Sequence, residues 1–288
     1  MKYKLILLTL VLAFRLPPSA WLHAASTIDA AHKYAYGANL GWMDCTGDAA
    51  NGAVVGEYVC SGCIYSANVG WINLGSGTPT NGIYYQNLSA NDFGVNNDGL
   101  GNLSGCAWGA NIGWINFENN GAPRVNLSTG NLSGYVWSAN CGWISLSNAV
   151  VYVRTDSIQQ GALAPNGLPT AWLLSNFGTT NVDANADPDH DGISNLQEYL
   201  AGTNPNDINS CLRITSIQHG NLGDPTRVDM IWTGVPSRCY AIEKRSALNN
   251  DVWSTQTEFP WMGANNAAFD SPEDQQFYRI RAYRPLMP

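Results

Sequence analysis

The sequence predicts a mainly β protein. An N-terminal domain built from repeated antiparallel hairpins is followed by a short helical connector and a C-terminal β-sandwich. The 288 residues include 29 Gly, 11 Trp and 13 Tyr but only 12% charged residues, which is typical of many short strands and tight turns. Residues 26–153 contain a four-copy internal repeat, and residues 208–288 contain runs that alternate apolar and polar side chains at period two.

Residues 1–25 have the pattern of an export signal. Lys2 and Lys4 precede an apolar run over 5–14 that is too short to span a bilayer, and the small residues Ala24 and Ala25 suit cleavage. No later run has the length and apolarity of a membrane helix. We therefore expect a mature protein without a membrane span that is secreted, extracellular, held at the cell surface or periplasmic.

The N-terminal domain, residues 26–153, repeats one motif: aromatic, small, Ala, Asn, apolar, Gly, Trp, aliphatic. Asparagine and glycine at the centre supply backbone positions where positive φ is favourable, so each copy predicts a β-hairpin. Four such hairpins can close as a barrel, a sandwich or a short stack, and the sequence does not choose among these. The repeat asparagines are separated by 29, 43 and 29 residues, which indicates a duplicated two-hairpin unit: Asn39, Asn68, Asn111 and Asn140.

The eight repeat aromatics allow two interpretations. Each hairpin needs the same packing contact, so the tryptophans after the glycine are expected in the core: Trp42, Trp71, Trp114 and Trp143. The aromatics before the turn are either core residues or residues that stack on sugar rings: Tyr36, Tyr65, Trp108 and Trp137. The region also resembles tryptophan-rich repeats of bacterial secreted proteins, a resemblance that implies no activity.

All seven cysteines follow the export signal, which fits an oxidising compartment and predicts structural disulfides. Their odd number leaves at least one unpaired. Cys141 occupies an apolar position of the repeat, so we expect it to be a buried free thiol. Within the repeat domain, disulfides 45–60 and 63–106 are possible pairings. The C-x-x-C at 60–63 lacks the following His of a haem site and the second pair of a zinc site.

Residues 154–182 predict a linker with one short helix, and residues 183–207 contain D-x-D-x-D-G followed by five residues and Glu. Ca²⁺ takes six to eight hard oxygen ligands, and this spacing supplies them. Three alternating carboxylates turn inward, a glycine permits the sharp turn, one backbone carbonyl faces the ion and the final glutamate adds two oxygens. The sequence therefore predicts a Ca²⁺ site made by Asp187, Asp189, Asp191, the carbonyl of Ile193 and Glu198.

The stretch DPDHDGISNLQEYLAGTNP, residues 187–205, resembles the thrombospondin type 3-like calcium repeats of bacterial secreted proteins. The resemblance implies calcium-dependent rigidity in an extracellular protein and no reaction. Asn204 stands where those repeats carry Asp, so this chain loses one carboxylate there. Asp183 and Asn185 extend the alternating oxygens upstream and are candidates for a second, weaker ion.

The C-terminal segment, residues 208–288, alternates apolar and polar residues over 212–217, 227–232, 240–244 and 277–282. Trp232, Tyr240 and the late run around Tyr278 resemble a fibronectin type III-like sandwich. That resemblance implies that Trp232 and Tyr240 are core residues. It also implies that Cys211 and Cys239, which open the first and third strands, lie at one pole of the sandwich, where a 211–239 disulfide is expected.

The composition also limits the functional classes. The formal net charge of −8 argues against nucleic acid as a partner. No serine-nucleophile, zinc-protease or phosphate-loop motif is present, and no signal marks a catalytic pair among Asp44, Asp48, Glu57 and Glu118. We therefore expect a non-catalytic protein with a structural, adhesive or glycan-binding role, whose partners are polysaccharide or cell-surface components. The alternative is a secreted enzyme that acts on polysaccharide with no recognisable motif.

Overall fold

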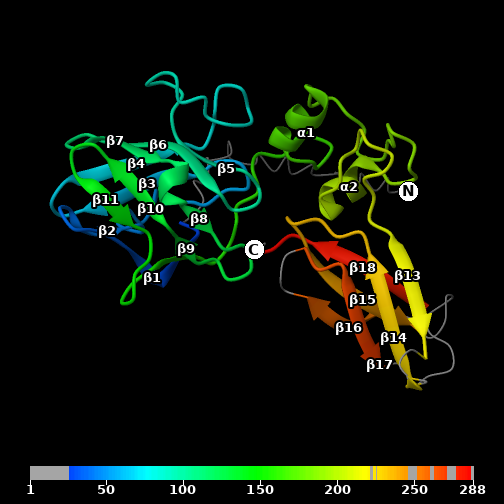
Figure 1. The fold of residues 1–288 in the computed structure, drawn as a ribbon. Coiled ribbons are helices and arrows are strands. Elements are labelled where there is room, and N and C mark those ends of the chain that lie inside the picture. The colour runs from blue at the N-terminus through cyan, green and yellow to red at the C-terminus, as the bar shows by residue number, and fades with distance from the viewer. Residues whose placement is uncertain are drawn as a thin grey trace, which may run out of the picture.

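The computed structural model describes residues 26–220, 223–224, 226–245, 252–259, 263–270 and 277–286, and the chain is mainly β as predicted. Figure 1 shows three parts: a sheet domain from the first half of the chain, a pair of short helices, and a second group of strands from the last part. The expected export signal, residues 1–25, lies outside the described residues.

The N-terminal domain is a closed antiparallel barrel. Each strand pairs with the next around the ring, and β11 returns to pair with β1 through Tyr36 opposite Ser145 and Gly37 opposite Ile144. Closure removes the exposed edges that an open meander would leave. The strands of the ring are β1 (Ile28–Gly37), β2 (Gly41–Asp44), β3 (Ser61–Ser66), β4 (Gly70–Ser76), β6 (Leu103–Gly109), β7 (Gly113–Phe117), β10 (Tyr135–Ser138) and β11 (Gly142–Ser145).

Smaller elements flank the ring. β5 (Val95–Asn97) pairs with β6, and β12 (Val153–Thr155) pairs with β1. A separate two-stranded sheet is formed by β8 (Arg124–Val125) and β9 (Leu132–Ser133), and η1 is a short 3₁₀ turn (Asn119–Gly121).

The four sequence repeats are the four hairpins β1–β2, β3–β4, β6–β7 and β10–β11. The expectation that the tryptophans after the glycine form the core is wrong, because these side chains are 42–51% exposed. Successive side chains of a strand point to opposite faces, and the aliphatic residue after each tryptophan takes the interior position. An eight-stranded ring encloses just enough space for such side chains, which are Met43, Ile72, Ile115 and Ile144, each 2% exposed.

The repeat asparagines join each turn to the preceding turn and so form a ring around one end of the barrel. Each side-chain amide donates a hydrogen bond to the carbonyl of the apolar turn residue of the preceding hairpin. The four bonds, each 2.9–3.0 Å long, run from Asn68 to Leu40, from Asn111 to Val69, from Asn140 to Ile112 and from Asn39 back to Cys141.

The glycine of each turn is needed because the turn has a positive φ and lies close to the asparagine of the next hairpin. Gly41 has φ of +74°, and a Cβ atom there would lie 3.1 Å from the amide nitrogen of Asn68. An L-residue is disfavoured at this φ, so the asparagine and the glycine of each repeat serve one turn geometry.

The structure contradicts the predicted disulfides. Among the described cysteines, Cys45, Cys60, Cys63, Cys106, Cys141 and Cys211 are free thiols, so bonds 45–60, 63–106 and 211–239 are not formed. Cys63 lies opposite Asn73 and Cys106 opposite Asn116 in their own hairpins, so the cross-strand partner of each of these cysteines is an asparagine and not a cysteine. Burial raises the pKa of Cys45 and Cys60 to about 12, so both act as small apolar core residues. Cys141 is a buried free thiol, as expected.

The connector contains α1 (Thr170–Phe177) and α2 (Asn195–Ala201). α1 begins after Pro169 and ends at Gly178, where φ is +68°, and it lies in the linker for which the sequence predicts one short helix. The two helices share a small core in which the rings of Trp172 and Tyr199 lie 5.6 Å apart. Upstream of α1 the chain follows the barrel, because Gln159 exchanges backbone hydrogen bonds with Val55 and Glu57.

The C-terminal domain is a sandwich of two three-stranded antiparallel sheets. One contains β13 (Ile214–His219), β14 (Arg227–Trp232) and β17 (Asn266–Asp270), and the other contains β16 (Ser254–Phe259), β15 (Cys239–Arg245) and β18 (Phe277–Tyr283). Val228, Met230 and Trp232 from one sheet share a core with Tyr240 and Ile242 from the other. Trp232 and Tyr240 are therefore core residues, as the resemblance to a fibronectin type III-like sandwich implies. Neither α-helix in the described part of the chain has the length and apolarity needed to cross a bilayer.

Candidate calcium site

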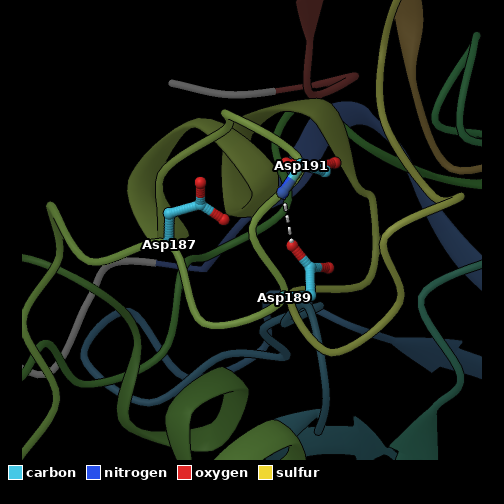
Figure 2. Close-up of side chains that lie close together, drawn as sticks. All are labelled: Asp187, Asp189 and Asp191. Carbon is cyan, nitrogen blue, oxygen red and sulfur yellow. Dashed lines mark hydrogen bonds between the residues drawn. The ribbon is translucent and has the colours of Figure 1, made fainter.

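The candidate site is the loop that leads into α2. Figure 2 shows Asp187, Asp189 and Asp191 close together on this loop, which turns sharply at Gly192, where φ is +90°. One carboxylate oxygen of each aspartate accepts a backbone N–H of the loop. These bonds come from Gly192 to Asp187 (2.9 Å), from Asp191 to Asp189 (3.3 Å) and from Ile193 to Asp191 (2.8 Å).

The other oxygen of each aspartate is buried and has no hydrogen-bond partner among the described residues. These atoms are Asp187 Oδ1, Asp189 Oδ2 and Asp191 Oδ2. The three carboxylates each offer an oxygen within 4.8 Å of the others. A buried anionic oxygen without a partner is costly, and three that converge are the arrangement that a cation stabilises.

Glu198 lies in the first turn of α2, outside the cluster of the three aspartates but close enough for their charges to act on it. Its side chain is fully buried, and both of its carboxylate oxygens lack a partner among the described residues. Ser194 fixes the start of the helix, because Gln197 Oε1 accepts the Ser194 N–H at 2.9 Å and the two side chains form a capping box. The capped helix therefore holds Glu198 in place.

The electrostatics of the loop are unfavourable without a cation. Burial, together with the charges of Asp189, Asp191 and Asp187, raises the pKa of Glu198 to about 7. Like charges at short distance raise the free energy of the folded loop, and a divalent cation reverses the sign of this contribution.

Asn195 is a site residue that the sequence reasoning did not select. It is fully buried, its Oδ1 has no hydrogen-bond partner among the described residues, and its Nδ2 donates to the Asp183 carbonyl at 2.8 Å. Its place in the sequence does indicate a role. Asn195 is the ninth residue of the loop, a position that contributes a ligand or a water-bound ligand in twelve-residue calcium loops.

The upstream candidates for a second ion lie in a separate turn. Asp183 Oδ1 accepts the N–H of Asn185 at 2.9 Å, and Asp183 holds Asn195 through its backbone carbonyl. Asn204 caps its own turn, where its side chain accepts the N–H of Asn206 at 3.1 Å. These residues therefore stabilise local turns next to the loop.

The residue after Glu198 connects the loop to both domains. Tyr199 donates to Glu57 of the barrel at 3.2 Å and accepts hydrogen bonds from Gln160 and Arg284. Arg238 of the sandwich donates to the Tyr199 carbonyl at 2.6 Å. No local sequence pattern marks this junction, because its members come from five distant segments of the chain.

The candidate stacking residues lie elsewhere, on the outer surface of the barrel. Each forms a ring pair with the tryptophan across its own hairpin. The centroid separations are 4.9 Å for Tyr36 and Trp42, 4.8 Å for Tyr65 and Trp71, 4.7 Å for Trp108 and Trp114, and 5.0 Å for Trp137 and Trp143. Tyr36, Tyr65 and Trp108 are exposed, and Trp137 is half-buried.

No protein-family model matches this chain, and no curated protein or solved structure matches it either. The resemblances to calcium repeats and to fibronectin type III-like domains therefore rest on the residues that carry them. What the loop can bind follows from the chemistry of its own side chains.

Proposed function

We propose that this is a secreted or cell-surface, non-catalytic calcium-binding protein with a structural, adhesive or glycan-binding role. The observation that carries the proposal is the set of five buried carboxylate oxygens without a partner in the described chain: one each from Asp187, Asp189 and Asp191, and both from Glu198. A folded protein rarely leaves such oxygens unsatisfied, so this group favours a bound cation.

The type and number of ligands favour Ca²⁺. Three aspartate oxygens, two from Glu198 and the Ile193 carbonyl give six, and Asn195 Oδ1 is a candidate seventh. Ca²⁺ takes six to eight oxygens in flexible geometry, whereas Mg²⁺ keeps several waters and zinc prefers nitrogen and sulfur. The loop contributes no nitrogen or sulfur ligand to this group.

The structural role rests on the sequence order Glu198–Tyr199. Glu198 is a proposed ligand, and Tyr199 bonds to Glu57 of the barrel and Arg284 of the sandwich. An ion held at Glu198 therefore also stabilises the turn of α2 that joins the two domains. A fibronectin type III-like sandwich and an export signal are consistent with such a connector in an extracellular protein.

The enzymatic alternative has less support. Asp48 and Glu57 both line a cavity of about 600 Å³ beside the barrel. The backbone N–H of Ala50 and the side chain of Asn51 lower the pKa of Asp48. Glu57 pairs with Arg284 at 2.8 Å. Each carboxylate is therefore already engaged, Asp48 within its own turn and Glu57 in a contact with the sandwich, and neither is prepared as the general acid that glycoside hydrolysis needs.

The proposal is tested by calorimetric titration of Ca²⁺ into the exported chain. We expect one saturable site, and its affinity should drop at least tenfold in Asp189→Asn and in Glu198→Gln, since each removes a charged ligand. Asp48→Asn is the matched control, because it changes a half-buried aspartate of the barrel that also caps its own turn. Unchanged affinity in both loop variants would reject the site.

A further inference from the structure

The barrel carries four aromatic pairs that are equivalent by its internal repetition. Every pair has its rings tilted or edge-on, with interplanar angles of 57–64°. The asparagine ring holds the four turns together at one end of the barrel, so the pairs form a belt next to that end. We call these four pairs the aromatic belt.

A polar residue of the preceding hairpin lies beside every pair of the belt. The first aromatic of each pair has two cross-strand partners. One is the tryptophan of its own hairpin, and the other is this polar residue on the neighbouring hairpin. The register gives Tyr65 opposite Asp44, Trp108 opposite Asn73, Trp137 opposite Asn116 and Tyr36 opposite Ser145. Each copy therefore repeats one arrangement of two aromatic rings and one polar side chain, in which the polar residue is an aspartate, an asparagine or a serine.

The belt is not required to fill the core. The interior is occupied by the aliphatic residues that follow the tryptophans, and the tryptophans themselves remain about half in water. The belt is also nearly uncharged, because Asp44 is its one acidic flank and pairs with Lys33 at 2.8 Å. An exposed aromatic surface of this kind marks a site of interaction.

We propose that the belt consists of four equivalent subsites for a neutral polysaccharide, which specifies the glycan-binding role included in the proposed function. A sugar ring has an apolar face of C–H groups and a rim of hydroxyls, so it suits a flat ring flanked by an amide or hydroxyl side chain. A protein partner would favour one continuous apolar centre, whereas polar residues interrupt this belt at every hairpin. A net charge of −8 disfavours acidic polysaccharides.

The repetition gives the belt a specific geometry. Neighbouring subsites are two strands apart, which is about 10 Å, and an extended chain can therefore contact adjacent subsites. Because the hairpins face outward around a closed ring, a single straight chain cannot contact all four. The barrel therefore binds with the avidity of several weak subsites and links separate polysaccharide chains.

The test measures retention of the calcium-loaded protein on insoluble cellulose and on mannan, with alginate as the acidic comparison. We expect retention on at least one neutral polymer. The apparent affinity should fall about fivefold in Trp71→Ala and more than a hundredfold when Trp42, Trp71, Trp114 and Trp143 are all replaced by alanine. Trp71→Phe keeps a flat ring and should keep most of the binding, and Phe277→Ala, an exposed aromatic of the sandwich, should bind as the parent does.

Two further measurements make the result decisive. Soluble cellohexaose or mannohexaose should change the tryptophan fluorescence of the unaltered protein, which needs no variant to fold. Calcium calorimetry on the same variants separates the two proposals, because the belt and the calcium loop share no residue. The belt proposal is overturned if the fourfold variant retains full binding, if neither neutral polymer retains the unaltered protein, or if only alginate does.

Discussion

Arg284 of the sandwich and Glu57 of the barrel form an ion pair, with 2.8 Å between Arg284 Nη2 and Glu57 Oε2. Both side chains are largely buried, and Tyr199 of α2 bonds to each of them. The two domains and the connector therefore meet at one charged contact. A cluster of this kind is destabilised strongly when one partner is removed, because the other remains buried with an uncompensated charge.

The first prediction concerns this junction. Glu57→Ala should destabilise the protein by about 3–5 kcal/mol, the usual cost of breaking a buried ion pair. Chemical denaturation followed by tryptophan fluorescence measures this change. Glu118→Ala replaces an exposed glutamate of the same domain and should leave the curve unchanged. Equal curves for the two variants would contradict a stabilising role of the Glu57–Arg284 pair.

The second prediction concerns calcium removal. With a chelator, repulsion among the loop carboxylates should increase proteolytic cleavage within 183–207. Cleavage should return to its original rate when calcium is restored in excess. The Glu198→Gln variant should be cleaved at a rate that no longer depends on calcium. Identical cleavage of the unaltered chain in both conditions would count against a calcium-stabilised connector.

The third prediction concerns pH. Burial and three aspartates raise the pKa of Glu198 from 4.5 to about 7, so the folded calcium-free protein holds this proton more tightly than the unfolded chain does. Its stability should therefore fall as pH rises from about 4.5 to about 7. Calcium competes with the same proton, so the apparent calcium affinity should rise across this range and level off above it.

Thermal melts of the calcium-free protein and calorimetry at several pH values measure both trends. Glu198→Gln removes the titrating carboxyl, and its calcium-free melting temperature should lose this part of the pH dependence. If the variant and the unaltered chain show the same dependence, Glu198 is not the group responsible.

The fourth prediction concerns the asparagine ring. Asn111→Ala removes the amide bond to the Val69 carbonyl and should cost about 1 kcal/mol. Asn39→Ala should cost a similar amount, because its bond to the Cys141 carbonyl is equivalent although it joins the first and last hairpins. Ala110→Ser alters an exposed residue in the same turn and serves as the control in thermal denaturation. No loss of stability in either asparagine variant would show that the ring contributes nothing.

The fifth prediction concerns the cysteines. Since Cys45 and Cys60 are buried thiols of raised pKa, a thiol reagent should modify them only after denaturation. A reducing agent should not lower the melting temperature, whereas loss of a native disulfide typically costs 2–5 kcal/mol. Intact-mass measurement after alkylation, with and without prior reduction, checks this. A drop in melting temperature on reduction would restore the disulfide interpretation.

The features that the sequence determined are local. The repeat motif specifies four hairpins, because the glycine of each copy takes the positive φ that the turn needs, and the asparagine lies two residues before it. The loop pattern likewise brings Asp187, Asp189 and Asp191 together, because alternating residues around a glycine turn lie on one side of it. The ends of α1 follow in the same way from Pro169 and Gly178.

Other features were decided only by the tertiary structure, because they depend on contacts between distant segments. Closure of the barrel pairs β1 with β11, and this closure determines which face of each strand is enclosed. The interior of the ring has room for one set of side chains, which the aliphatic residues fill, so the tryptophans lie outside. The free thiols and the junction of Glu57, Tyr199 and Arg284 depend in the same way on how remote strands and α2 pack, and no spacing along the chain encodes that packing.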